Sequence, residues 1–188
     1  MKMTMHEILS TLIERKYEEI KKKQQTGMFE KIFAFEANAI GQIGEAFVKE
    51  VFKAFSLPLD SNKEVIHDEY DLLSQGKKIE IKTARKGLKN DTFQFNGINP
   101  KYNYDYIILL GITANDLLYY IIDKKQDHSY KHKERKDTIR INGKEKKLVA
   151  MNPGNQANYK LTLSLKELKP IAGFAEELTK IFGGGNHD

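Results

Sequence analysis

Two carboxylates and one ammonium group are predicted to share one face of a hairpin within Tyr70–Ala84. This segment reads Tyr-Asp-Leu-Leu-Ser-Gln-Gly-Lys-Lys-Ile-Glu-Ile-Lys-Thr-Ala, which indicates two short strands joined near Gln75-Gly76. Because side chains alternate between the faces of a strand, Glu80 and Lys82 point the same way. A turn at Gln75-Gly76 places Asp71 opposite Glu80, whereas a turn one residue later places Asp71 opposite Lys82.

In either register the charged groups share one face, and Leu72, Ile79 and Ile81 point to the opposite face, toward the core. Two carboxylates provide the hard oxygen ligands that Mg²⁺ prefers. A bound Mg²⁺ offsets the charge that develops on a phosphate and acidifies a water molecule. The lysine can hold that water and attract negative charge. This set of groups suits the hydrolysis of a phosphodiester.

The tripeptide Glu-x-Lys is not specific by itself, because it occurs six times in the chain. Only the copy that starts at Glu80 lies in an alternating apolar strand with an aspartate on the preceding strand. An amphipathic hairpin whose charged face simply meets water remains the alternative interpretation.

Three further features favour a site. Gly41–Phe47 precedes the hairpin on a predicted helix and carries Glu45 at the edge of the apolar stripe. The strand after Lys82 presents Gln94 and Asn96 on one face. Residues 74–147 hold 17 lysines and arginines against 9 acids, a net charge of +8, whereas the remainder holds 14 against 17, a net charge of −3. A basic surface of this kind suits a polyanion such as nucleic acid.

The elements that position these residues are predicted from two periodicities, that of a helix and that of a strand. Helical spacing predicts helices over 4–20, 28–37, 39–55 and 164–182, the first opened by a capping box of Thr4 and Glu7. Strand patterns cover 69–74, 78–84, 92–98, 104–111, 117–122 and 159–163, with a basic, loop-rich stretch over 123–147. We therefore expect a mixed α+β (α/β) fold in one domain. It comprises a helical part (1–37), a catalytic core (38–122), a basic loop region (123–158), a strand and helix (159–182) and a tail (183–188).

The arrangement resembles the PD-(D/E)xK nuclease superfamily, in which a helix carries a glutamate, a strand carries an aspartate and the next strand carries Glu-x-Lys. The matching residues are Glu45, Asp71 and Glu80-Ile81-Lys82, and Tyr70 stands where the superfamily usually has proline. The resemblance spans about Gly41–Gly111. It implies a restriction-endonuclease-like core with a mixed sheet of about five strands flanked by helices. It also implies that Asp71, Glu80 and the Ile81 carbonyl bind Mg²⁺, and that cleavage leaves a 5′-phosphate.

Within the superfamily the chain is most similar to type II restriction endonucleases, and in particular to the small catalytic subunits of heterodimeric type IIS enzymes. Their large subunits recognise the site and nick one strand. This resemblance implies double-stranded DNA and a larger nicking subunit as partners, or otherwise a homodimer. A repair nuclease or junction resolvase is an enzymatic alternative, and a non-catalytic DNA-binding or assembly module is the alternative of another class.

The composition is compatible with this interpretation. The 188 residues carry a net charge of +5, and the absence of cysteine excludes a disulfide scaffold and any thiolate site. No apolar run approaches the length of a membrane span, and the first residues lack the apolar segment of a signal peptide, so we expect a cytoplasmic protein. The side chains expected to contact DNA are Lys78, Arg85, Lys86, Gln94, Asn96, Lys131, Lys133, Arg135, Lys136 and Arg140.

Three other groups of residues have side chains that could bind a metal or DNA. The acidic residues Asp60, Glu64, Asp68 and Glu69 precede the hairpin and are interpreted mainly as a solvated loop, with a metal ligand among them as the alternative. His128 and His132 have the spacing of a shared helix face, but no third metal ligand accompanies them. The amide-rich run 152–156 suits either a plain turn or contacts to base edges.

Overall fold

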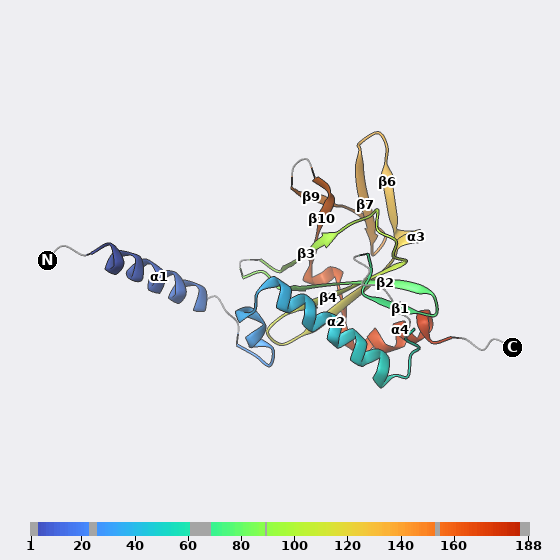
Figure 1. The fold of residues 1–188 in the computed structure, drawn as a ribbon, viewed down its shortest axis with the longest axis horizontal. Helices are drawn as coiled ribbons and strands as arrows, with labels where there is room; N and C mark the ends of the chain where they lie inside the picture. Colours follow the sequence, from blue (N-terminus) through green and yellow to red (C-terminus); the bar gives the residue numbers. More distant parts are fainter. Residues whose placement is uncertain (1–3, 23–25, 61–68, 89, 153–154, 185–188) are drawn as a thin grey trace.

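The computed structural model describes residues 4–22, 26–60, 69–88, 90–152 and 155–184. A mixed sheet of five strands lies at its centre (Figure 1). In spatial order the strands are β1 (Leu72–Ser74), β2 (Lys77–Arg85), β4 (Tyr106–Ile112), β5 (Leu117–Asp123) and β11 (Lys169–Pro170). β2 and β4 run parallel, and the other neighbouring pairs are antiparallel. The predicted α+β fold with a mixed central sheet of five strands is confirmed.

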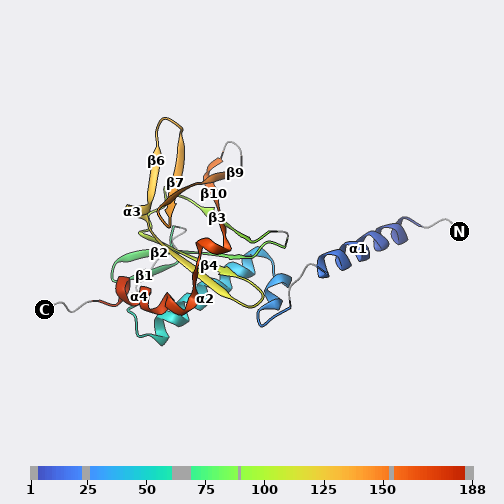
Figure 2. The same ribbon diagram turned by 180° about the vertical axis from the view of Figure 1, so that it is seen from behind.

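Two helices cover one face of this sheet. α2 (Ala37–Ala54) and α4 (Phe174–Phe182) lie on the same side in Figures 1 and 2. Their apolar residues form one buried cluster with the strands, which includes Val48, Phe52, Ile79, Ile81, Ile108, Leu110, Phe174, Leu178 and Phe182. The predicted core-facing side of the hairpin is therefore confirmed, because Leu72 belongs to the same cluster.

A second layer covers the opposite face. β3 (Thr92–Ile98) belongs to a separate three-stranded sheet, in which it pairs with β10 (Asn155–Ser164), and β10 also pairs with β9 (Val149–Asn152). Phe93, Phe95, Leu161 and Leu163 from this layer are completely buried. Glu80, on the charged side of the β1–β2 hairpin, is consequently buried.

The basic stretch 123–147 was expected to be loop-rich, and this prediction is wrong. It contains a short helix, α3 (Lys124–Asp127), and three antiparallel strands, β6 (His128–Lys131), β7 (Lys136–Ile141) and β8 (Lys144–Lys147). Ile139 and Ile141 are buried on either side of exposed Arg140, which is the alternation of a half-buried strand. Asn142-Gly143, both with positive φ, form the turn between β7 and β8. We call β6, β7 and β8 the basic arm.

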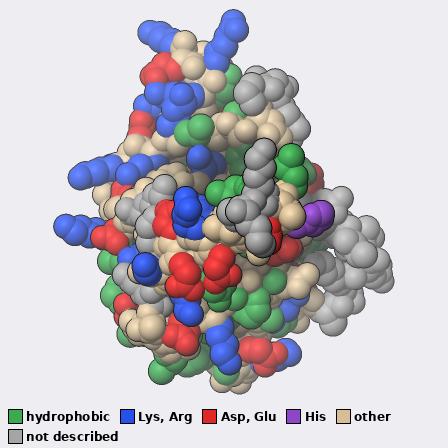
Figure 3. Space-filling model, turned by 90° about the vertical axis from the view of Figure 1, so that its left-hand side faces the viewer, with side chains coloured by type: hydrophobic (Ala, Val, Ile, Leu, Met, Phe, Trp, Pro, Cys, Tyr) green, Lys and Arg blue, Asp and Glu red, His purple; other side chains and the backbone are tan. Residues whose placement is uncertain are grey.

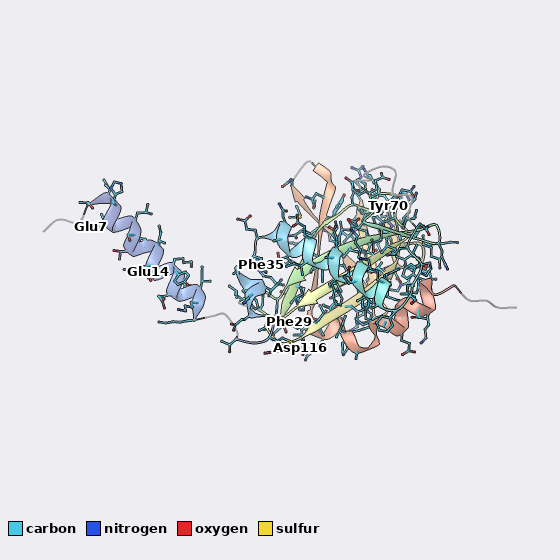
Figure 4. All side chains as sticks on the ribbon, turned by 60° about the horizontal axis from the view of Figure 1, so that its bottom comes forward. Glu7, Glu14, Phe29, Phe35, Tyr70 and Asp116 are labelled. Carbon is cyan, nitrogen blue, oxygen red and sulfur yellow. The ribbon has the colours of Figure 1, made fainter. Side chains whose placement is uncertain are left out.

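The N-terminal helix α1 (Met5–Lys21) has the predicted capping box of Thr4 and Glu7 and buries none of its residues. It projects away from the body in Figures 1 and 2. Figure 4 shows Glu7 and Glu14 on this distant helix and Phe29 and Phe35 at the near edge of the body.

The helices expected over 28–37 and 164–182 are shorter than predicted. The first is a 3₁₀ helix, η1 (Glu30–Ala34). The second divides into η2 (Leu165–Glu167), β11, η3 (Ile171–Gly173) and α4. Pro170 explains the division, because proline disfavours a helical conformation in the residue before it and cannot donate a backbone hydrogen bond. In the described part of the chain, no helix is both long and apolar enough to cross a membrane.

Candidate functional site

The β1–β2 hairpin adopts the first of the two expected registers. Leu72 lies opposite Ile79, and the turn residues Gln75 and Gly76 both have positive φ, of 49° and 74°. Continued by one residue, this register places Asp71 opposite Glu80, and the alternative pairing with Lys82 is excluded.

The backbone of β2 fixes the Asp71 carboxylate. The Asp71 N–H donates to the Ile79 carbonyl at 2.9 Å, and Asp71 Oδ2 accepts from the Ile81 N–H at 2.7 Å. Asp71 therefore lies just before β1, with its side chain held against the strand that carries Glu80 and Lys82. The carboxylate oxygen takes the place of a backbone acceptor at this edge of the sheet.

Glu80 and Lys82 form an ion pair between Oε1 and Nζ in a mostly buried setting. Only 6% of the Glu80 surface is exposed, so its carboxylate has lost most of its hydration. Burial raises the pKa of Glu80 to about 7; the Lys82 ammonium opposes this rise and the Asp71 carboxylate adds to it. Burial outweighs the ion pair, and a further cation at this position would favour the ionised carboxylate.

Tyr104 lies close enough to this carboxylate to be affected by its charge. It is buried, and its pKa is raised mainly by burial and also by the negative charge of Glu80. The alternative in which the charged face of the hairpin meets water is therefore wrong for Glu80.

A groove of about 820 Å³ lies beside these residues. It is bounded by the N-terminal half of α2, by β2 and β3, and by Met151 and Asn158. It brings together eight of the predicted site residues, namely Glu45, Asp71, Ile81, Lys82, Arg85, Lys86, Gln94 and Asn96. Glu80 does not line the groove itself. It is buried next to the groove and forms an ion pair with Lys82, which does line it.

Close packing of α2 on β2 positions Glu45 at the groove. A Cβ on Gly44 would lie 1.7 Å from Thr83 Oγ1, so the glycine allows the helix to approach the strand directly. Val48 and Phe52, on the same helix, are completely buried and anchor it. The Gly-Glu pair at 44–45 thus places an acid next to the contact between helix and strand.

Two of the basic groove residues already have structural partners. Arg85 Nη1 donates to the carbonyls of Ile32, Phe33 and Phe35, and so holds η1 against β2. Lys86 pairs with Asp91 at 3.0 Å. Gln94 and Asn96 project from exposed positions of β3, as the alternation predicted.

The remaining predicted DNA contacts lie outside the groove. Lys78 has its ammonium 5.7 Å from the centre of the Tyr70 ring. Lys131, Lys133, Arg135, Lys136 and Arg140 belong to the basic arm or its β6–β7 turn. Lys131 and Lys136 form ion pairs with Glu145 and Glu134, respectively. Lys and Arg side chains gather at the top of Figure 3, where the β6–β7 hairpin projects in Figure 1.

The histidine pair does not share a helix face. His128 lies on β6, where its Nε2 is 2.8 Å from Asp137 Oδ1, and the His132 ring packs edge-on against Tyr130. Within the described ranges, no group of three or more histidine, aspartate or glutamate side chains could hold a metal ion.

The acidic run before the hairpin has a structural role where it is described. Asp60 accepts hydrogen bonds from the backbone N–H groups of Gln75 and Gly76, and so stabilises the hairpin turn. Glu69 accepts from the Asn103 N–H at 3.4 Å. Glu64 and Asp68 lie outside the described residues. In the amide-rich run, Asn152 ends β9 and Asn155 begins β10, and residues 153–154 lie outside the described residues.

Sequence reasoning missed Asn158, which lines the groove from β10. Its Oδ1 and Thr83 Oγ1 are buried side-chain atoms without a hydrogen-bond partner among the described residues. Nothing in the local pattern around Asn158 points to the hairpin, because the two meet only through the pairing of β10 with β3.

The donor set fits Mg²⁺. Two carboxylates, Asp71 and Glu80, lie side by side, and the Ile81 carbonyl belongs to the residue between Glu80 and Lys82. Mg²⁺ commonly takes one or two protein carboxylates and fills its other positions with water and substrate phosphate, so a third acid is not required.

No protein-family profile, curated protein or solved structure matches the chain.

Proposed function

We propose that the chain is a Mg²⁺-dependent endonuclease that hydrolyses phosphodiester bonds in double-stranded DNA and leaves a 5′-phosphate. The observation that carries the proposal is the convergence of Asp71, Glu80 and Lys82: Asp71 and Lys82 line the groove, and Glu80 is buried next to them. A lone ion pair on a hairpin would not need a second carboxylate fixed beside it, nor an open groove along the same strand.

Each residue has a separate role in this chemistry. Asp71, Glu80 and the Ile81 carbonyl would hold Mg²⁺, which when bound supplies charge neutralisation at the phosphate and a more acidic water. Lys82 would donate a hydrogen bond to the attacking water and orient its oxygen toward phosphorus. The water oxygen forms the new P–O bond and releases a proton to the solvent, the P–O3′ bond breaks, and the leaving O3′ takes up a proton from a solvent water. Glu45 would assist as a supporting ligand or through a water.

The surface around the groove suits a DNA substrate. Gln94 and Asn96 offer amide groups from β3, and amides can bond base edges. The basic arm supplies lysines and arginines at a distance from the carboxylates, where they could follow a phosphate backbone. Specificity supplied by a larger nicking subunit of a restriction system remains part of the proposal, with a homodimer or a repair nuclease as the alternative.

A non-catalytic DNA-binding module is the second candidate, and one observation favours it. Asp71 and Lys82 both already have partners inside the protein, as a structural hairpin would require.

Cleavage of supercoiled plasmid DNA with Mg²⁺ distinguishes these candidates. The wild type is compared with Lys82→Met and Glu80→Gln, alone and with a candidate large subunit. Lys77→Met is the matched control, because Lys77 lies on the same strand but donates to the Ile181 carbonyl outside the groove. We expect cleavage by the wild type and the control, and loss of cleavage in the other two variants. Equal cleavage by all four proteins would refute the site, and DNA binding without cleavage would favour the module.

A further inference from the structure

Asn158 brings a buried amide oxygen to the part of the groove that contains Lys82. It precedes Tyr159, which lies opposite Ile98 in the β10–β3 pair. Asn158 Oδ1 accepts no hydrogen bond from any described residue. Leaving a buried polar group unsatisfied costs about 1–3 kcal/mol. An unsatisfied polar group in the wall of a groove calls for an explanation, and a role in binding is one.

Gly97 lies close to both this amide oxygen and the Lys82 ammonium. A Cβ on Gly97 would lie 3.7 Å from Lys82 Nζ and 4.0 Å from Asn158 Oδ1. The ammonium and the amide oxygen therefore border the same small space, above a residue that has no side chain and a φ of 76°. Lysine carries its charge on a flexible four-carbon stem, so Lys82 can move its ammonium across this space without a change in the backbone.

Lys82 and a divalent cation would compete for the same carboxylate. The ammonium pairs with Glu80 Oε1, the group that the proposed function also assigns to Mg²⁺. Two cations on one buried carboxylate repel each other. Binding of Mg²⁺ at Glu80 is consequently favoured by another acceptor for Lys82.

We infer that Asn158 Oδ1 is this second acceptor, and that Lys82 moves from Glu80 to Asn158 when a divalent cation binds. Asn158 is then a positioning residue: it keeps the ammonium beside the attacking water and lowers the cost of cation binding. The inference rests on the proposed function only in its use of Glu80 as a ligand for the cation.

Calorimetric titration of the full chain with Mg²⁺ alone tests this inference. Asn158→Leu keeps a similar side-chain volume but removes the acceptor, and Lys82→Met removes the ammonium. We expect Asn158→Leu to weaken Mg²⁺ binding about tenfold, as is typical when a group that supports a ligand is lost. Lys82→Met is expected to bind Mg²⁺ more tightly than the wild type, because the competing cation is gone.

The double variant is decisive. In the Lys82→Met background, Asn158→Leu should leave the Mg²⁺ affinity unchanged, because no ammonium remains to be accepted. Thr83→Val is the matched control: it removes the other buried oxygen without a partner in the described chain, and it should leave the affinity of the wild type unchanged. Asn158→Asp retains Oδ1 and is expected to bind Mg²⁺ at least as tightly as the wild type. Circular dichroism confirms folding, and Asn158→Ala replaces the leucine variant if that variant does not fold.

Three results would overturn the inference. The first is equal Mg²⁺ affinity of the wild type and Asn158→Leu, and the second is that Asn158→Leu weakens Mg²⁺ binding as much in the Lys82→Met background as in the wild type. The third is no measurable Mg²⁺ binding by the wild type. Plasmid cleavage is measured separately. Cleavage without coupling between Asn158 and Lys82 refutes the inference alone, and coupling without cleavage refutes the proposed function alone.

Discussion

The stability of the protein is predicted to fall as Glu80 ionises, even though Glu80 pairs with a lysine. The carboxyl releases its proton near pH 4.5 when the chain is unfolded, but near pH 7 in the folded protein, mainly because it is buried. Between these values the folded state binds more protons than the unfolded state. The free energy of unfolding therefore decreases as the pH rises through this window.

The difference between the two pKa values sets the size of the effect. Each pKa unit corresponds to about 1.4 kcal/mol, so ionisation of Glu80 is expected to cost about 3 kcal/mol of stability by pH 8. This is a large part of the 5–15 kcal/mol or so that is typical of a folded domain. Most of the loss should occur between about pH 5 and about pH 7.

Urea unfolding of the wild type and Glu80→Gln at a series of pH values measures this contribution. The glutamine keeps the size of the side chain and does not titrate, so subtraction removes the pH dependence that other groups cause. The difference, wild type minus variant, should fall by about 3 kcal/mol between pH 4.5 and pH 8. A constant difference, or one that increases with pH, would show that the ion pair with Lys82 outweighs burial and would refute the reasoning.

Four further predictions concern other parts of the molecule. Mg²⁺ should raise the thermal midpoint of the wild type more at pH 8 than at pH 5, because the cation favours the ionised Glu80 carboxylate. Glu80→Gln should lose this pH dependence, and an equal rise in both proteins would contradict the cation site. Removal of residues 1–25 should change the free energy of unfolding by less than about 0.5 kcal/mol in urea, since α1 buries no residue, and a large loss would reveal contacts made in solution. Gly44→Ala should destabilise the protein by about 1–3 kcal/mol, because the new methyl group would lie 1.7 Å from Thr83 Oγ1; unchanged urea unfolding would show that α2 can move away. Lys133→Ala, in the turn of the basic arm, should reduce the slope of log K against log salt for DNA binding by about 0.9, and an unchanged slope would place this turn away from the phosphates.

Local patterns were sufficient to predict the hairpin and its charged face. Gln75-Gly76 specifies a tight turn with positive φ, and Leu72, Ile79 and Ile81 specify which side is buried, so only a one-residue slip of register remained open. The strand at Thr92–Ile98 was predicted with the bounds that the structure has, because its alternation is regular.

The prediction of a loop over residues 123–147 was wrong because the many charged side chains obscured an alternation of buried and exposed positions. The basic arm contains many lysines, which suggested a loop, yet Ile139 and Ile141 alternate with Arg140, and Asn142-Gly143 is a typical hairpin turn. The same misinterpretation hid the fact that this region packs on the body and covers one face of the central sheet.

The properties that matter most for chemistry depend on contacts between segments distant in the sequence. Glu80 and Lys82 could be placed on one face from their spacing, but that face was equally compatible with water. Glu80 is buried on this face because β3 (Thr92–Ile98) pairs with β10 (Asn155–Ser164), a strand far away in the sequence, and forms a second layer. This pairing also brings Asn158 to Gly97 and Lys82. No spacing rule predicts it, since either strand could satisfy its hydrogen bonds with another partner. The carboxylate pair thus follows from a local pattern, whereas the raised pKa of Glu80 and the second acceptor for Lys82 follow from the tertiary fold.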